Sequence, residues 1–282
     1  MPPEPRENTF LALDPHGFHR VAYYEWGDPR EYHAVVCVHG LTRNGRDFDM
    51  LATQLAQYCR VVSMDVVGRG ASEWLVHKED YGFPLYLADA ATLIALVSQT
   101  VKPGPISGFI QRLTGKGRAP FIDWVGTSMG GLIGMMLASR TSSPIRRLVL
   151  NDVGPFIPWQ ALAHLKHRHA AGHAPFSEIA EVERYIRQEC ADFGPLTDKQ
   201  WTHVAEHSVE RLDDGRYALG WDPAVVRTQA GAGQQKAIEF GSDFLFGVDL
   251  WPVWNAVRCP TLVLRGALRT TLLSCPTQRA FL

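Results

Sequence analysis

The chain has 282 residues, with 28 Lys and Arg against 29 Asp and Glu, and its formal net charge is −1. This balance gives no reason to expect nucleic acid or an anionic membrane surface as a partner. Hydrophobic residues make up 46% of the chain, which is enough to fill one large domain or a domain with an inserted unit.

The N-terminus and the cysteines indicate a compartment. Residues 1–7 are polar and rich in proline, and they lack the apolar core of a signal peptide. No apolar run elsewhere approaches the length of a transmembrane helix. The five cysteines are dispersed without C-x-x-C spacing, at Cys37, Cys59, Cys190, Cys259 and Cys275. Such a set is typical of reduced thiols, so we expect a cytoplasmic protein without a cofactor.

In the first half of the chain, residue patterns typical of strands alternate with patterns typical of helices. Residues 18–26 are rich in aromatic and β-branched side chains and predict a strand. The short apolar runs 34–38 and 60–64 predict buried parallel strands. Apolar residues at helical spacing predict helices over 47–57 and 85–99.

The alternation continues after residue 120. A strand from Phe121 leads into a helical pattern over 132–138, and apolar runs at 147–150 and 259–266 predict two more strands. This order predicts an α/β fold, a mostly parallel twisted sheet flanked by helices.

Two segments interrupt this order. Residues 101–120 are basic and rich in glycine and proline, which predicts a surface loop. The polar segment from about 155 to 246 contains helical patterns, one of them starting at Thr197 or Asp198 as N-cap. We expect residues 156–245 to form a helical cap inserted into a core made of residues 1–155 and 246–282.

The pattern G-x-S-x-G occurs at Gly126, Ser128 and Gly130, between the strand from Phe121 and the following helix. A turn this sharp leaves no room for side chains beside the serine, which explains the glycines. The serine Oγ is then exposed above the strand ends, and the Met129 N–H lies at a helix N-terminus, where it can stabilise an oxyanion. The alternative is a glycine-rich turn with an incidental serine.

Five motifs in this order resemble the α/β-hydrolase superfamily. They are the H-G loop at 38–44, the D-x-x-G-x-G-x-S loop at 65–72, the G-x-S-x-G turn at 126–131, the N-D-x-G-P segment at 151–155 and the strand at 259–266. The resemblance implies an α/β-hydrolase fold with a cap and a serine hydrolase that acts on a small ester or a related acyl or C–C substrate.

The resemblance also implies roles for individual residues. Ser128 is the nucleophile, and the backbone N–H groups of Leu41 and Met129 form the oxyanion hole. Gly40 lets its loop approach closely, and His39 is structural rather than a base. Two later residues of the loop, Arg43 and Asn44, touch substrate or brace the loop.

The acid and the histidine of the triad are not where the family places them. The family's acid follows the strand at 259–266 and its histidine comes later, yet no carboxylate follows Asp249 and the last histidine is His207. Asp152 is the best candidate acid, and the alternative is a role as a structural turn or a hinge of the cap. The tail from Ala267 resembles a frameshifted or prematurely stopped end, which predicts that the last strand and helix are missing.

No other histidine is identified as the triad base. Residues 172–175 match the family's G-H-x-P pattern at His173, but in the wrong chain order, so we interpret the match as coincidence. His164, His167 and His169 could cluster around a metal, but a solvated helix face is the better interpretation. Four aromatic residues line a pocket or fill the cap core: Trp159, Phe176, Trp201 and Trp221.

Two hypotheses follow from the sequence. The first is a serine hydrolase with a small ester-like substrate, a Ser128 nucleophile and a backbone oxyanion hole. The alternative is a catalytically incomplete protein of the same fold, either a binding module or a truncated gene product, because a serine hydroxyl is a weak nucleophile without a base.

Overall fold

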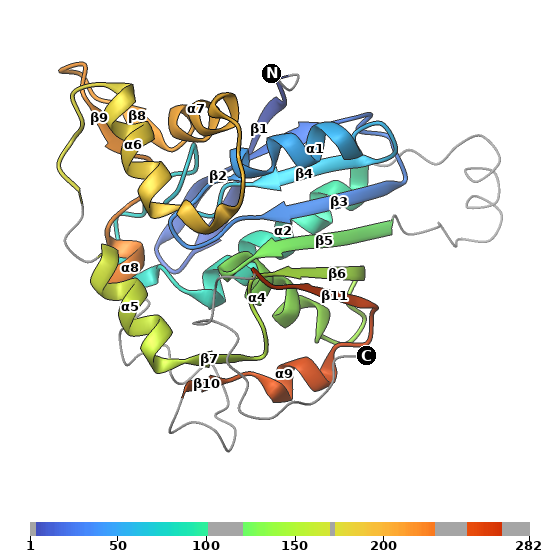
Figure 1. Ribbon diagram of the computed structural model, residues 1–282. Helices are drawn as coiled ribbons and strands as arrows, with labels where there is room; N and C mark the ends of the chain where they lie inside the picture. The colour runs from blue at the N-terminus through green and yellow to red at the C-terminus, as the bar shows by residue number, and fades with distance from the viewer. Residues whose placement is uncertain (1–3, 101–120, 170–172, 229–246, 267–282) are drawn as a thin grey trace.

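A computed structural model describes residues 4–100, 121–169, 173–228 and 247–266 (Figure 1). Its centre is a seven-stranded sheet in the order β1-β2-β4-β3-β5-β6-β11. The strands are β1 (Arg6–Asp14), β2 (Gly17–Trp26), β3 (His33–Val38), β4 (Arg60–Met64), β5 (Phe121–Thr127), β6 (Ile145–Asn151) and β11 (Thr261–Leu264). The five strands from β4 to β11 run parallel, whereas β1–β2 and β2–β4 are antiparallel pairs. The predicted mostly parallel sheet is therefore confirmed.

Strand β3 shows how the sheet divides two hydrophobic layers. Successive side chains of a strand point to opposite faces. Ala34, Val36 and Val38 accordingly belong to one buried cluster, and Val35 and Cys37 to another. A strand that is covered on both faces can be apolar throughout, which is why residues 34–38 form a continuous apolar run.

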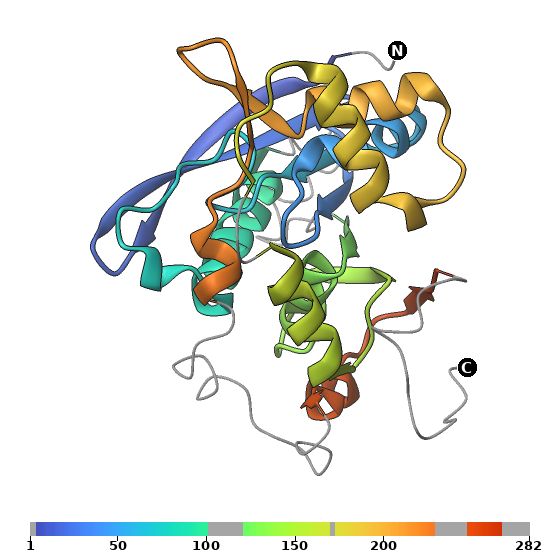
Figure 2. The same cartoon turned by 60° about the vertical axis from the view of Figure 1, so that its left-hand side comes forward.

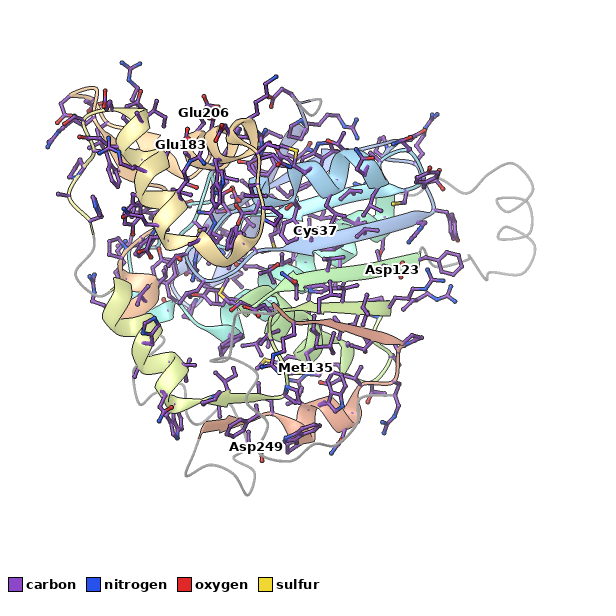
Figure 3. All side chains as sticks on the ribbon, viewed as in Figure 1. Cys37, Asp123, Met135, Glu183, Glu206 and Asp249 are labelled. Carbon is purple, nitrogen blue, oxygen red and sulfur yellow. The ribbon has the colours of Figure 1, made fainter. Side chains whose placement is uncertain are left out.

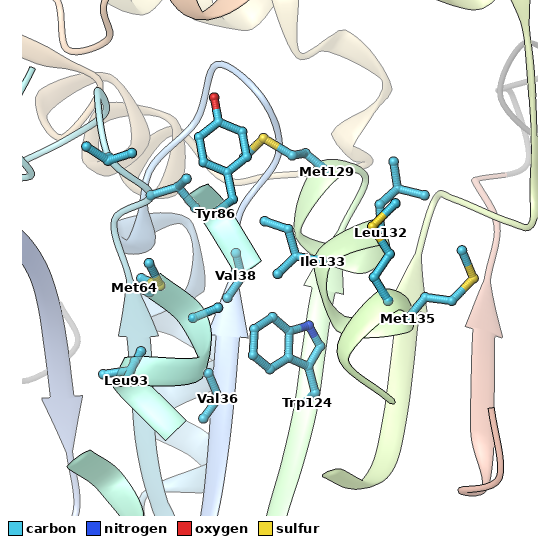
Figure 4. Close-up of a cluster of buried hydrophobic side chains, with 14 of the residues drawn as sticks. Val36, Val38, Met64, Tyr86, Leu93, Trp124, Met129, Leu132, Ile133 and Met135 are labelled. Carbon is cyan, nitrogen blue, oxygen red and sulfur yellow. The ribbon is translucent and has the colours of Figure 1, made fainter. Parts of the chain in front are cut away.

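Helices cover both faces of the sheet. The helix α1 (Asp49–Leu55) follows the 3-10 turn η1 (Gly45–Phe48) and contributes to the smaller cluster. The larger cluster contains residues of α2 (Phe83–Thr100) and α4 (Met129–Ala138), with α9 (Trp251–Ala256) packed against it. Figure 4 shows Trp124 of β5 beneath Ile133 of α4 in this cluster. The core therefore fixes α4 against the end of β5.

Among its described residues, the segment predicted as the cap contains three helices of nine or more residues near one end of the parallel strands (Figures 1 and 2). They are α5 (Trp159–His169), α6 (Ile179–Glu189) and α7 (Asp198–Glu206), with a 3-10 turn η3 (Ala191–Phe193) before α7. Thr197 is the N-cap of α7 and forms a capping box with Gln200, which settles the predicted helix start. In Figure 3, Glu183 of α6 and Glu206 of α7 lie apart from the sheet that carries Cys37.

Several short elements were not anticipated from the sequence. The cap segment is not purely helical, because it also contains short strands, which are β7 (Phe156–Pro158), β8 (Val209–Arg211) and β9 (Tyr217–Leu219). β7 pairs with β10 (Gly247–Asp249), and β8 pairs with β9. Strands of three residues are too short to give a sequence pattern. The short elements η2 (Lys78–Asp80) and α8 (Ala224–Thr228) and the whole of β1 were also not anticipated.

Several predictions lie outside the described residues. These are the basic loop at 101–120, the tail from Ala267 and Cys275. The other four cysteines are free thiols, as expected for reduced cysteines. None of the helices in the described part of the chain is long and apolar enough to cross a membrane.

Candidate active site

Ser128 occupies a strained turn between β5 and α4. Its φ is 50° and its ψ is −113°, a conformation that non-glycine residues rarely adopt. Neighbouring backbone groups hold it there, because the Ser128 N–H donates to the Asn151 carbonyl at 2.9 Å and the Ser128 carbonyl accepts from the Leu132 N–H at 3.1 Å. The turn therefore places the serine side chain at the carboxyl end of β5, beside the end of β6.

The flanking glycines are required by sterics. A Cβ added at Gly126 would lie 2.3 Å from the backbone of Gly130, and one added at Gly130 would lie 2.0 Å from the Val38 carbonyl oxygen. At Gly40, by contrast, an added Cβ would lie 3.8 Å from the Ser128 Cβ, which is an ordinary contact. Gly40 therefore brings its loop next to Ser128, but the fold itself leaves space for a side chain there.

The peptide between Gly40 and Leu41 has a fixed orientation. Its carbonyl oxygen accepts from the His39 Nδ1–H at 2.7 Å and from the Arg43 N–H at 3.2 Å. In a trans peptide the N–H points opposite to the carbonyl, so these bonds also fix the direction of the Leu41 N–H. This is the group that the family resemblance identifies as one oxyanion donor.

His39 performs this positioning as a neutral, buried ring. Its Nε2 accepts the Val66 N–H at 2.9 Å, so its Nδ1 carries the proton that is donated to Gly40. Burial lowers the pKa of His39 to about 3. Both ring nitrogens are engaged, which agrees with a structural role and leaves no lone pair for use as a base.

Arg69 links the two halves of the proposed oxyanion hole. Its side chain is fully buried, and its Nε donates to the Leu41 carbonyl at 2.9 Å. Its Nη2 lies 3.7 Å from the Met129 sulfur, and its Nη1 donates to the Tyr86 hydroxyl at 3.0 Å. Figure 4 shows the Met129 sulfur beside the Tyr86 ring. None of the hydrogen bonds and ion pairs among the described residues joins this guanidinium to a carboxylate.

Asp65 holds the loop that carries Arg69. Its carboxylate accepts from the Gly45 N–H at 2.6 Å and the Ala71 N–H at 2.7 Å. Burial raises its pKa to about 6. The loop at 65–72 was recognised in the sequence, but Arg69 was not singled out. The available signal was a basic residue between two glycines after a buried strand.

Arg43 and Asn44 brace the loop and connect it to the segment predicted as the cap. The Arg43 guanidinium pairs with Asp47 and donates to the Ser208 Oγ at 3.0 Å. The Asn44 amide donates to the His207 carbonyl at 2.6 Å. Of the two roles left open by the sequence, the observed contacts are those of bracing.

Asp152, the candidate acid, comes directly after Asn151, whose carbonyl accepts the Ser128 N–H. It follows the last residue of β6, and its φ of 55° marks a tight turn. Its N–H donates to the Leu264 carbonyl at the end of β11 at 2.8 Å. The two places from which the family could supply an acid, the ends of β6 and β11, are therefore adjacent. The residues after Gly266 lie outside the described part.

No histidine side chain described by the structure hydrogen-bonds the Ser128 hydroxyl. His173 is exposed, and its ring stacks on Phe176 of the cap segment at 4.1 Å between centroids. His164 is exposed on α5, whereas the side chains of His167 and His169 lie outside the description. The expected absence of a recognisable triad histidine thus remains a prediction.

The aromatic residues considered for a pocket have different surroundings. Phe176 and Trp201 belong to a buried cluster within the cap segment, and Trp221 belongs to the larger core cluster. Trp159 is partly buried at the start of α5. Three of the four therefore pack in cores.

The sequence of this chain is similar to those of known hydrolases. The sequence pattern of the "Alpha/beta hydrolase family" matches residues 35–279. A 3-hydroxybutyrate-oligomer hydrolase of Cupriavidus necator is 37% identical over 276 residues, which cover 97% of this chain and 85% of that protein. A 2-(acetamidomethylene)succinate hydrolase of Mesorhizobium japonicum is 26% identical over 81% of this chain and 68% of that protein.

A solved hydrolase structure is also similar to this chain. The crystal structure of an alpha/beta hydrolase from Novosphingobium aromaticivorans superposes with a TM-score of 0.70 at 27% identity, covering 92% of this chain and 80% of that one.

Proposed function

Since the chain belongs to the alpha/beta hydrolase family and is a hydrolase of that type, we propose that it cleaves small esters with Ser128 as nucleophile. The observation that carries this proposal is the anchored peptide between Gly40 and Leu41. The Gly40 carbonyl is fixed by two hydrogen bonds, and Gly40 lies beside Ser128. An anchored N–H costs no reorganisation when charge develops on a substrate oxygen.

The reaction would proceed in two steps. The Ser128 Oγ attacks the ester carbonyl carbon and loses its proton to a base, while the N–H groups of Leu41 and Met129 bind the developing oxyanion. Collapse of the intermediate breaks the C–O bond and releases the alcohol, which takes up the proton. Water then attacks the acyl-enzyme in the same way and releases the acid. In this scheme Asp152 would orient and charge-stabilise the base.

Arg69 would contribute a positive field at the oxyanion. It is a buried cation that contacts the Leu41 carbonyl and the Met129 side chain. A charge is screened weakly inside a protein, so a cation with no carboxylate partner among the described residues favours negative charge nearby. This supports a site that binds an oxyanion or an anionic substrate.

The substrate class is proposed from the relatives. The Cupriavidus necator protein, by its name, acts on 3-hydroxybutyrate oligomers, and it aligns with nearly the whole of this chain. Such oligomers are short chains of ester bonds that end in a carboxylate. We therefore propose short 3-hydroxybutyrate oligomers as the first substrates to test.

One observation favours a second candidate function. The Ser128 hydroxyl has no histidine partner among the described side chains, and a serine without a base reacts slowly. A slow or inactive protein of the same fold, which binds the ester without turning it over, is therefore the alternative.

Hydrolysis of the 3-hydroxybutyrate dimer decides between the two. Release of the monomer would be measured for the native chain, for Ser128→Ala and for Ser139→Ala as a matched control at the opposite end of α4. We expect the first substitution to lower kcat/KM by about 10³-fold or more and the second to leave it unchanged. Binding of the dimer without turnover, in a cooperatively folded protein, would contradict the enzyme proposal and support the alternative.

A further inference from the structure

Three potential metal ligands meet where α7 approaches the core. His203 lies near the end of α7, His207 is its C-cap residue, and Asp49 begins α1. One ligand atom from each lies within 4.8 Å of the others. This group is separate from Ser128 and is not used in the reaction proposed above.

His203 is the residue that makes this group unusual. It is 98% buried, since its exposed fraction is 2%, yet neither of its ring nitrogens makes a hydrogen bond of acceptable geometry. Its Nε2 lies 2.9 Å from the Asp49 Oδ2 all the same. Adjacent ligands of a tetrahedral metal with bonds of about 2.0–2.1 Å are about 3.3 Å apart. The two atoms are therefore about 0.4 Å closer than two such ligands, so an ion between them would need a small outward shift of one side chain.

His207 is already oriented as a ligand. Its Nδ1 hydrogen-bonds the His203 carbonyl at 2.8 Å. A carbonyl can only accept, so Nδ1 carries the proton and Nε2 keeps its lone pair. Metal-binding histidines usually have one ring N–H held by such a backbone carbonyl. His207 is only partly buried, which gives an ion a way in from solvent.

The charges near the group are compatible with a divalent cation. Arg46 pairs with both oxygens of Asp49 through its Nε, at 3.0 Å to Oδ1 and 2.8 Å to Oδ2. Arg46 also pairs with Glu4 at 3.0 Å. The carboxylates of Asp49 and Glu4 therefore both pair with the Arg46 guanidinium. A carboxylate has enough lone pairs to bind several partners at once. The Arg46 Nη2 also lies 2.7 Å from the Asp49 Oδ2, so metal binding at Oδ2 would require the guanidinium to shift to Oδ1.

We propose that Asp49, His203 and His207 bind a transition-metal cation of the Zn²⁺ class, with water as a fourth ligand. Imidazole nitrogens and a carboxylate suit such ions. The metal would join α7 to α1, next to the hydrogen bond between Asn44 and the His207 carbonyl. This revises the expectation, drawn from the sequence, that the protein has no metal.

Thermal melting with and without Zn²⁺ tests the proposal independently of activity. A ligand at about a hundred times its Kd should raise Tm of a chain of this size by about 5 °C or more. We expect this rise in the native chain and its loss in His207→Gln and Asp49→Asn. The matched control is His77→Gln, from an exposed group of His16, His77 and Glu79, which should keep the rise.

Co²⁺ provides a second readout on the native chain, in case a variant does not fold. One equivalent of Co²⁺ bound with strong four-coordinate visible absorption, and displaced by Zn²⁺, is the expected result. Absence of a Tm rise and of this absorption in the native chain would overturn the proposal. So would a Tm rise that persists in the two site variants or disappears in His77→Gln.

Discussion

Replacing His39 with glutamine should remove a specific part of the acid sensitivity of this protein. His39 is buried, its Nδ1–H donates to the Gly40 carbonyl, and its Nε2 accepts from the Val66 N–H. Glutamine supplies one donor and one acceptor of similar reach, but it does not titrate. The substitution His39→Gln therefore keeps both kinds of hydrogen bond and deletes the ionisable group.

The magnitude follows from the pKa difference between the folded and unfolded states. An exposed histidine has a pKa of about 6.5, whereas burial lowers that of His39 to about 3. Because the folded pKa is depressed, the neutral ring stabilises the fold above pH 6.5. This stability is lost as the pH falls toward 3, by about 1.4 kcal/mol per pH unit. Between pH 7 and pH 5 the loss is about 2 kcal/mol.

Urea denaturation at pH 7 and pH 5 gives the free energy of unfolding of the native chain and of His39→Gln. The effect is the difference between the losses that the two proteins show. The buried Asp65 has a raised pKa of about 6, so its contribution has the opposite sign and increases stability as the pH falls through that value. Because Asp65 is present in both proteins, its contribution to the pH dependence of stability cancels in the difference between them. The native chain should lose about 2 kcal/mol more than His39→Gln, whereas the exposed His164→Gln should behave like the native chain. An equal pH dependence for native and His39→Gln would refute the assignment of a buried neutral ring.

Three further substitutions test the geometry around Ser128. Gly126→Ala puts a Cβ 2.3 Å from the Gly130 backbone, so its free energy of unfolding in urea should drop by about 3 kcal/mol; a drop below about 0.5 kcal/mol would show that the turn can relax. Ser128→Gly removes a strained φ of 50° and should raise the free energy of unfolding by roughly 1 kcal/mol while abolishing turnover; a less stable variant would count against strain at this turn. Arg69→Met should lower kcat for ester hydrolysis by about 10²-fold with little change in KM, because the Leu41 carbonyl loses its donor; a folded variant with native kcat would show that Arg69 does not position the oxyanion peptide.

Local patterns predicted most of the fold. The strand and helix around Ser128, the buried runs at β3 and β4 and the start of α7 at Thr197 each depend on residues within a few positions of one another. The strand β1 was missed because it forms an exposed hairpin with β2. Burial alternates along this strand, with Ala12 buried, but Leu11 and Leu13 occupy exposed positions and are 66% and 63% exposed, so apolar and polar residues do not alternate there.

Contacts between distant segments could not be predicted from the sequence. Arg69 acquires its role through Leu41 and Met129, which lie 28 and 60 residues away in the chain. The hydrogen bond from the Asn44 amide to the His207 carbonyl connects residues that are 163 positions apart in the chain. A local pattern can mark one residue of such a pair, as the two glycines beside Arg69 do, but a single sequence does not show which distant residue it will contact.

Labelling with a fluorophosphonate, followed by mass analysis of the peptides, tests the assignment of Ser128 most directly. The reagent forms a stable covalent bond to a serine that is activated and faces an oxyanion hole. The account predicts one adduct per chain, on the peptide that contains Ser128, and none in Ser128→Ala with the same cooperative melt. A folded chain that hydrolyses the 3-hydroxybutyrate dimer with no adduct, or with its adduct on another residue, would contradict it.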